Sequence, residues 1–82
     1  MVEDLIVRKV RWSPEKNTLF FETQPMADGK IKVGGWNPRN ELTLQEGREI
    51  AKKLIGTMLS EFQEAACVLT GEAIGRRVDV DG

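Results

Sequence analysis

The longest regular pattern of apolar positions in the chain lies within residues 43–69. Apolar residues recur there at alternating steps of four and three, the spacing of one face of an α-helix, at Ala51, Ile55, Met58, Phe62, Ala65 and Leu69. A second set flanks this stripe and widens it, namely Ile50, Leu54, Leu59 and Ala66. We therefore predict one long amphipathic helix over approximately residues 44–69.

Both ends of this segment carry helix-end signals. Thr43 and Glu46 have the Ser/Thr-x-x-Glu spacing of a capping box, and Gly71 follows the last periodic residue as a C-cap. Gly47 and Gly56 lie inside the segment, and each weakens a helix by up to about 1 kcal/mol relative to alanine. Such a helix would be roughly 39 Å long, whereas a typical strand is roughly 17–20 Å long. A small sheet cannot cover the whole helix, so we expect the remaining apolar surface to contact the C-terminal tail, a second copy or a different partner.

Three segments before the helix predict antiparallel strands, over approximately residues 5–12, 18–24 and 30–34. Turn chemistry separates the first two at residues 13–17, and Asp28-Gly29 is a hairpin signal before the third. Alternation in the third strand places Ile31 and Val33 on the core. Residues 34–40 show no periodicity, so we predict a loop that leads into the helix.

Two registers of the first hairpin stay open. If residues 13–16 form the loop, Val10 lies opposite Leu19. One face then carries Ile6, Val10, Trp12, Leu19 and Phe21, and the other carries Val7, Lys9, Arg11 and Phe20. A slip of one residue would turn Phe20 inward and pair Arg8 with Glu22. We favour the first register.

Together these elements predict a single α+β domain over residues 1–82, a three-stranded antiparallel β-meander packed on one long amphipathic helix. The tail, residues 71–82, is short and polar, and its residues 77–80 either add a fourth strand or fray. Residues 42–54 resemble the capped helix that follows a β-meander in small bacterial and phage-encoded proteins, a pattern that is not specific to one family.

The composition argues against several kinds of chemistry. The chain has no His and no Tyr, and the lone Cys67 excludes an internal disulfide and the usual zinc sites. No pair of carboxylates lies in an apolar stretch that would shift a pKa, and neither GxxxxGK[ST] nor GxGxxG occurs. We therefore expect no catalytic residue, no cofactor and no metal, and a small enzyme ranks third among the alternatives.

No apolar run approaches the 18 or more residues of a transmembrane helix, and the first four residues are acidic where a signal peptide would be basic. We expect a cytoplasmic protein without a membrane partner.

One side of the predicted helix suggests self-association. Glu61 and Glu64 stand toward its C-terminus, where the helix dipole disfavours negative charge. An antiparallel second copy would pair its Glu61 with Lys53. We therefore predict a homodimer, whose seam would consist of Ile50, Lys53, Leu54, Thr57, Met58, Glu61, Glu64 and Ala65. The alternative is that the whole apolar stripe packs within the chain.

On a second candidate surface, basic and aromatic residues alternate on the outward face of the sheet and continue into the loop that follows it. This surface consists of Lys9, Arg11, Phe20, Lys30 and Lys32 on the sheet and of Trp36 and Arg39 in the loop. Proteins that bind single-stranded nucleic acid use such faces, whereas edge lysines also discourage aggregation. The net charge of −1 and the pI of about 5.4 lack the basic excess of nucleic-acid binders. We therefore predict a non-catalytic protein-binding or adaptor module, with nucleic-acid binding as the alternative.

Overall fold

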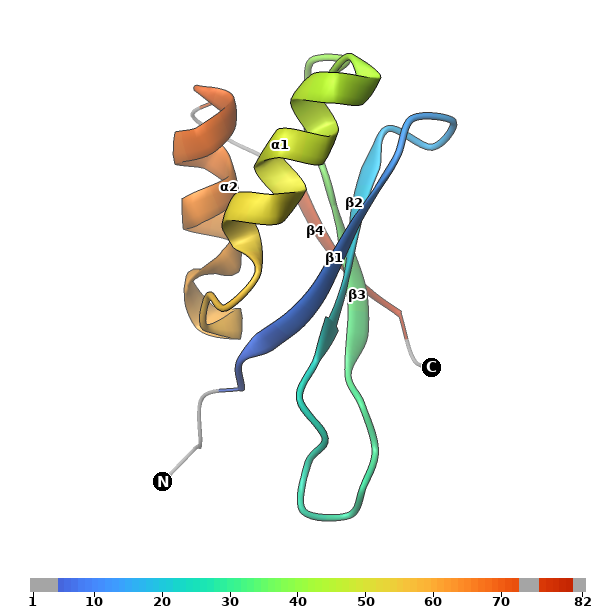
Figure 1. The fold of residues 1–82 in the computed structure, drawn as a ribbon, viewed down its shortest axis with the longest axis vertical. Helices are drawn as coiled ribbons and strands as arrows, with labels where there is room; N and C mark the ends of the chain where they lie inside the picture. Colours follow the sequence, from blue (N-terminus) through green and yellow to red (C-terminus); the bar gives the residue numbers. More distant parts are fainter. Residues whose placement is uncertain (1–4, 73–75, 81–82) are drawn as a thin grey trace.

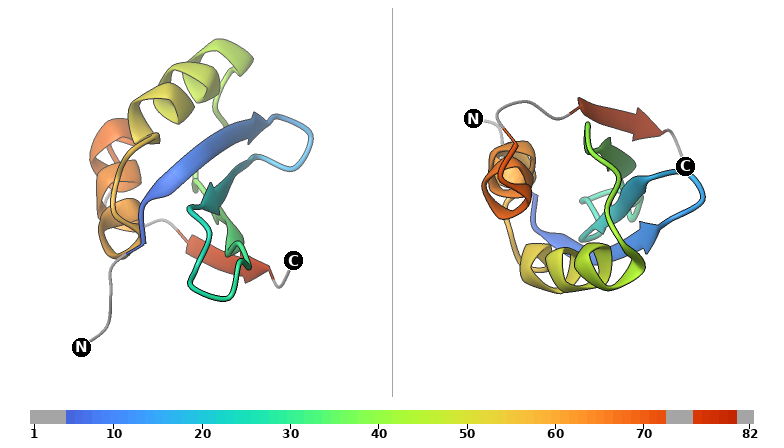
Figure 2. Two further views of the ribbon diagram at one scale, coloured as in Figure 1. Left: turned by 60° about the horizontal axis from the view of Figure 1, so that its bottom comes forward. Right: turned by 90° about the horizontal axis from the view of Figure 1, so that it is seen from above.

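The computed structural model describes residues 5–72 and 76–80. The elements follow the order β1 (Val7–Ser13), β2 (Thr18–Thr23), β3 (Val33–Asn37), α1 (Leu44–Leu54), a 3₁₀ turn η1 (Leu59–Glu61), α2 (Phe62–Thr70) and β4 (Arg76–Val80). All neighbouring strands are antiparallel in the sheet order β1-β2-β3-β4. Both helices lie on one side of this sheet (Figures 1 and 2). The α+β class and the antiparallel meander of β1 to β3 are therefore confirmed.

The first hairpin takes a register that differs from both predicted ones. Trp12 lies opposite Leu19 and Val10 opposite Phe21, a shift of two residues from the favoured register. Because side chains of a strand alternate with a period of two, this shift leaves Phe20 on the outer face beside Arg11. The turn closes through Asn17, which takes a left-handed φ of 48°.

A bulge in β1 corrects the predicted placement of one core residue. The register shifts between Val7 and Lys9, so the alternation of side chains is interrupted at Arg8. Val7, expected on the outer face, is fully buried, while Arg8 and Lys9 are exposed. The bulge therefore lets β1 bury Val7 and still present consecutive basic residues to solvent.

The third strand begins later than predicted and takes in residues 34–37, the first part of the segment expected to be a loop. Ile31, expected in the core, is 44% exposed, whereas Trp36 is fully buried inside β3. The turn at Asp28 and Gly29 is present, with Gly29 at φ +81°. Gly35 suits the middle of the sheet because a Cβ there would lie 2.8 Å from the Thr18 side chain.

The prediction of one continuous helix over residues 44–69 is wrong, because the chain leaves the helix after Leu54. Gly56 takes a left-handed φ of +93°, and its N–H donates to the carbonyl of Val7 at 2.8 Å. The N–H of Val7 in turn donates to the carbonyl of Thr57 at 2.8 Å, so the connection pairs with β1. Both helices bury apolar side chains against the same sheet. Apolar residues therefore keep the spacing of a helix on both sides of the break, and the sequence pattern does not reveal that the helix ends.

The predicted ends of the helical segment are confirmed. Thr43 and Glu46 form the reciprocal capping box at the start of α1, and Gly71 ends α2 in the left-handed conformation. At the C-terminus, β4 pairs with β3 in the segment for which the sequence left strand and fraying open. The rest of the predicted tail beyond Glu72, residues 73–75 and 81–82, lies outside the described residues.

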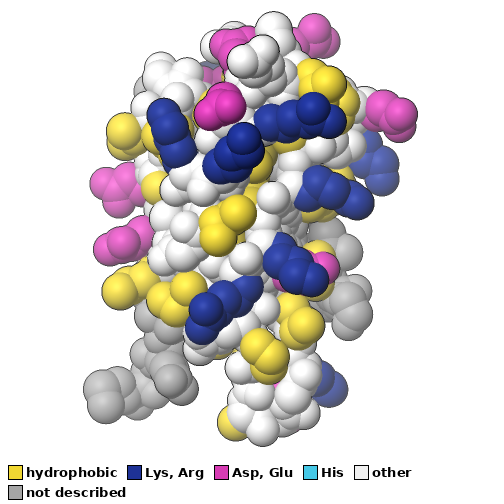
Figure 3. Space-filling view, viewed as in Figure 1, with side chains coloured by type: hydrophobic (Ala, Val, Ile, Leu, Met, Phe, Trp, Pro, Cys, Tyr) yellow, Lys and Arg dark blue, Asp and Glu magenta, His cyan; other side chains and the backbone are white. Residues whose placement is uncertain are grey.

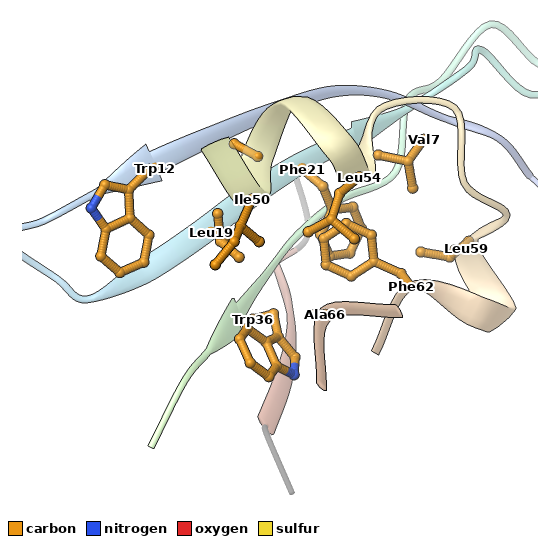
Figure 4. Close-up of a cluster of buried hydrophobic side chains, with 11 residues drawn as sticks. Val7, Trp12, Leu19, Phe21, Trp36, Ile50, Leu54, Leu59, Phe62 and Ala66 are labelled. Atoms are coloured by element: carbon orange, nitrogen blue, oxygen red, sulfur yellow. The ribbon is translucent and has the colours of Figure 1, made fainter. Parts of the chain in front are cut away.

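One apolar core joins the sheet to both helices (Figure 4). The buried side chains described come from β1, β2, β3, α1, η1 and α2, and consist of Val7, Trp12, Leu19, Phe21, Trp36, Ile50, Ala51, Leu54, Leu59, Phe62 and Ala66. The rings of Phe21 and Phe62 lie 4.7 Å apart between centroids. Within residues 5–72 and 76–80, no helix is long and apolar enough to cross a membrane. The cytoplasmic location stays a prediction.

Candidate functional site

A groove with a charged lining lies between β1 and α1. It has a volume of about 360 Å³, and we call it the β1–α1 groove, lined by Val10, Arg11, Trp12, Arg48, Ala51, Lys52 and Ile55. Its three charged lining residues are all cations, and all three are exposed. The same face of the molecule shows Lys and Arg side chains spread over α1 and β1, with Asp and Glu mostly toward its margins (Figure 3). The groove therefore combines an apolar floor with a positive rim.

The sequence builds this groove from two periodicities. Along β1, Val10 and Trp12 point toward the helices while Arg11 lies on the outer face beside Phe20. Along α1, Arg48 and Lys52 are four residues apart, so they stand on one side of the helix. Gly47 allows α1 to approach β1 closely, because a Cβ at this position would lie 2.3 Å from the Trp12 ring.

The groove continues into a second hollow at Phe20. This Phe20 hollow, of about 530 Å³, shares Val10, Arg11 and Ile55 with the groove and adds Arg8, Lys9, Phe20, Phe21, Glu22 and Val33. The Arg11 guanidinium lies 5.9 Å from the centroid of the Phe20 ring, and the Lys16 ammonium lies 5.7 Å from it. Glu22 is the acid in its lining, and Lys9 lies 4.0 Å from it. Both hollows are therefore predominantly positive.

The second predicted surface is assembled only in part. Lys9, Arg11 and Phe20 come together as expected, because they occupy paired positions of β1 and β2. Trp36 does not join them, since it is buried in the core beneath the helices. Lys30 is exposed on the β2–β3 loop and Lys32 is half-buried just before β3.

Arg39, the remaining member of that surface, lies in a loop that is tied to the rest of the fold. The backbone N–H groups of Arg39 and Asn40 each donate to the Glu72 carboxylate at 2.8 Å. The side-chain amide of Asn17 also donates to the Pro38 carbonyl at 3.1 Å. These bonds fix the connection between β3 and α1 as part of the framework, away from the lining of both hollows.

The predicted self-association seam does not exist as one surface. Leu54 is fully buried and Ile50 is 8% exposed, so both belong to the core. The seam required a helix through Thr57 and Met58, and the chain is not helical there. The remaining members are half-buried or exposed on separate elements, namely Lys53 on α1, Glu61 on η1, and Glu64 and Ala65 on α2.

The sequence did not reveal the contribution of α1 to the groove. Arg48 and Lys52 carry an i, i+4 signal, which indicates a shared side of a helix but not the strand beside it. Ile55, a member of the predicted apolar stripe, is 49% exposed at the end of α1. Lys52 also lies 3.8 Å from Glu49, an exposed ion pair that water screens and that leaves its charge available.

One pKa shift belongs to a carboxylate at the start of α1. The pKa of Glu46 is lowered, first because its carboxylate accepts a hydrogen bond from the Thr43 backbone N–H and second through the Thr43 hydroxyl. This shift belongs to the helix cap. Within the described part of the chain, no group of three or more His, Cys, Asp or Glu side chains is arranged to hold a metal ion.

Comparison of the chain with protein-family models, curated proteins and solved structures found no match.

Proposed function

We propose that this protein is a non-catalytic protein-binding module whose β1–α1 groove binds an acidic segment of a partner protein. The observation that carries the proposal is the lining of the groove, in which three exposed cations, Arg11, Arg48 and Lys52, surround apolar side chains. Opposite charge steers a partner to the site and selects its sign, and the apolar floor supplies surface to bury.

The apolar part of the groove favours a polypeptide partner. Val10 is half-buried and Ile55 is 49% exposed, so both offer surface that a partner side chain can cover. A peptide carries apolar and acidic side chains together, whereas a nucleic acid brings mainly phosphate charge and base rings. The net charge of the chain, −1, also gives weak overall attraction to a polyanion.

Nucleic-acid binding is the second candidate, and the Phe20 hollow favours it. An aromatic ring among basic side chains is the arrangement on which single-stranded bases stack. Arg11 and Lys16 already lie over the Phe20 ring, so a base would have to displace at least one of these cations. This competition ranks the nucleic-acid function second.

Self-association is a narrower form of the protein-binding proposal. Glu61 and Glu64 are exposed on η1 and α2, outside the linings of both hollows, and they offer acidic groups to the groove of a second copy. A salt-sensitive increase in mass at high protein concentration would support this arrangement. A monomer mass at high concentration and low salt would exclude it and leave a different protein as the partner.

Selection from a library of random twelve-residue peptides displayed on phage tests the proposed function. We expect the enriched peptides to combine Asp or Glu with apolar residues. Their binding should weaken at least about tenfold in the double variant Arg48→Glu/Lys52→Glu, since reversing two charges removes two attractions and adds two repulsions. The matched control is Lys30→Glu/Lys53→Glu, which makes the same change of net charge outside the groove lining.

Equal weakening in the two double variants would show that net charge alone drives binding, and it would contradict the proposal. A twenty-nucleotide oligothymidine serves as the competing ligand at the same ionic strength. If this oligonucleotide binds more tightly than every selected peptide, and its affinity falls steeply with salt, the nucleic-acid function replaces the protein-binding one.

A further inference from the structure

β1 is an edge strand, and part of its edge is already paired by the chain itself. Its order in the sheet leaves one side of β1 without a strand neighbour. On this side the connection after α1 pairs with the beginning of β1, where Leu59 N–H donates to Leu5 O at 2.7 Å and Val7 exchanges two bonds with Gly56 and Thr57. An isolated β-bridge between Ile6 and Met58 belongs to the same pairing. This edge therefore accepts a strand-like segment in the folded protein.

The pairing stops at Val7. Among the described residues, the backbone–backbone bonds of this connection reach Leu5 and Val7 but not residues 9–13, which pair with β2 alone. Five residues of a strand span roughly 17 Å, enough for an added strand of similar length. Unpaired N–H and C=O groups along such an edge are a template for another strand.

The β1–α1 groove runs along this free edge. Its lining takes three consecutive residues of β1, Val10, Arg11 and Trp12, although their side chains alternate between the two faces of the sheet. Side chains from both faces of a sheet can line the same hollow only at the edge of a strand, where the two faces meet. α1 forms the other wall with Ala51, Ile55 and its two cations. An edge strand beside a helix is a recurring way to hold an extended peptide, whose backbone bonds give affinity while pockets read alternate side chains.

The charges decide which strand this edge accepts. Lys9 and Arg11 project from β1, and Arg48 and Lys52 stand on the opposite wall, so a strand that enters between them meets basic groups from both sides. A second copy of β1 carries the same basic residues and is repelled. An acidic strand meets opposite charge on both sides.

We infer that the acidic segment binds by strand addition, as an extended peptide that pairs its backbone with residues 9–13 of β1 inside the β1–α1 groove. This inference rests on the proposed function and specifies its geometry. The peptide extends the edge pairing that the chain begins at Leu5 and Val7, and it becomes a fifth strand beside β1.

Backbone methylation of a synthetic peptide tests this inference. The probe is a ten-residue peptide in which Glu alternates with Val and Thr, with both ends capped. The comparison peptide has the same sequence but is N-methylated at two adjacent central residues, because successive N–H groups of a strand point to opposite edges. Both peptides carry the same charge, so calorimetric titration of the full chain separates backbone pairing from charge attraction.

We expect the unmethylated peptide to bind at least about tenfold more tightly than the methylated one, and to slow hydrogen exchange of backbone amides within residues 9–13. In Arg48→Glu/Lys52→Glu its binding should weaken at least about tenfold, and in Lys30→Glu/Lys53→Glu it should change by less than about twofold. Equal binding of the two peptides would overturn strand addition and leave an acidic partner held by side chains. If neither peptide binds, strand addition is also overturned. The proposed function is tested separately, by the binding of the peptides selected from the library.

Discussion

At the scale of single residues, two glycines carry structural requirements that composition alone does not show. Gly47 lies inside α1, where glycine is normally unfavourable, and its missing side chain lets the Trp12 ring lie against the helix. Gly35 lies inside β3, and its missing side chain leaves room for the side chain of Thr18. In both cases the lack of a side chain permits a close contact between two elements, and the Gly47 contact fixes the distance between the walls of the β1–α1 groove.

Replacement of Gly47 by alanine should destabilise the fold, although alanine favours a helix by about 1 kcal/mol. The added Cβ would lie 2.3 Å from the Trp12 ring, and relief of such overpacking typically costs about 1–3 kcal/mol. Urea unfolding followed by circular dichroism measures the change in free energy of unfolding. In a Trp12→Leu background, which removes the ring, the same substitution should cost less. A gain in stability from Gly47→Ala in the unmodified chain would contradict this packing.

At the scale of elements, local signals predicted the elements and their ends better than their continuity. The capping box at Thr43 and the C-cap at Gly71 were visible because each depends on residues a few positions apart. The break after Leu54 was not visible, because it depends on backbone pairing with Val7, far away in the sequence. Trp36 was misplaced because the two glycines before it suggested a loop, and only the neighbouring strands show that they suit a central strand.

The direction in which one substitution changes the free energy of unfolding distinguishes two separate helices from one continuous helix. Gly56 takes a φ of +93° with no atom within 4 Å of a built Cβ, so Gly56→Ala meets backbone strain alone. The left-handed region costs a residue with a side chain about 1–2 kcal/mol, and we expect a loss of this size in urea unfolding. In a continuous helix the same change would stabilise by up to about 1 kcal/mol. Gly56→Asn, which tolerates this region better, should lose less.

The α1 cap predicts a pH dependence with a defined sign. Because the folded state lowers the pKa of Glu46, its contribution to stability is present above the pKa of the unfolded chain, about 4.3 for a free glutamate, and is lost as the pH falls through the folded value. Glu46→Gln keeps a capping side chain but removes the charge. The difference in thermal midpoint between the two proteins should therefore shrink as the pH is lowered from 7 to 3. A difference that stays constant would contradict this role of the carboxylate.

At the scale of the whole molecule, the candidate site depends on how the helices sit on the sheet. Lys9, Arg11 and Phe20 could be predicted as one face because they share a hairpin, and a register error of two residues preserves the faces. The groove could not be predicted, because nothing in the sequence indicates that Arg48 and Lys52 stand beside β1. The net charge of −1 likewise conceals the face on which basic side chains gather.

The measurement that tests the central claim most directly is a nuclear magnetic resonance titration of the ¹⁵N-labelled chain with the acidic ten-residue peptide. The largest shifts of backbone amide resonances should fall in residues 9–13 of β1 and residues 48–55 of α1 and its end, with small shifts in α2. Two results would contradict an acidic partner in the β1–α1 groove. The largest shifts would then fall either on α2 or at Glu22 and Val33, which line the part of the Phe20 hollow outside the groove.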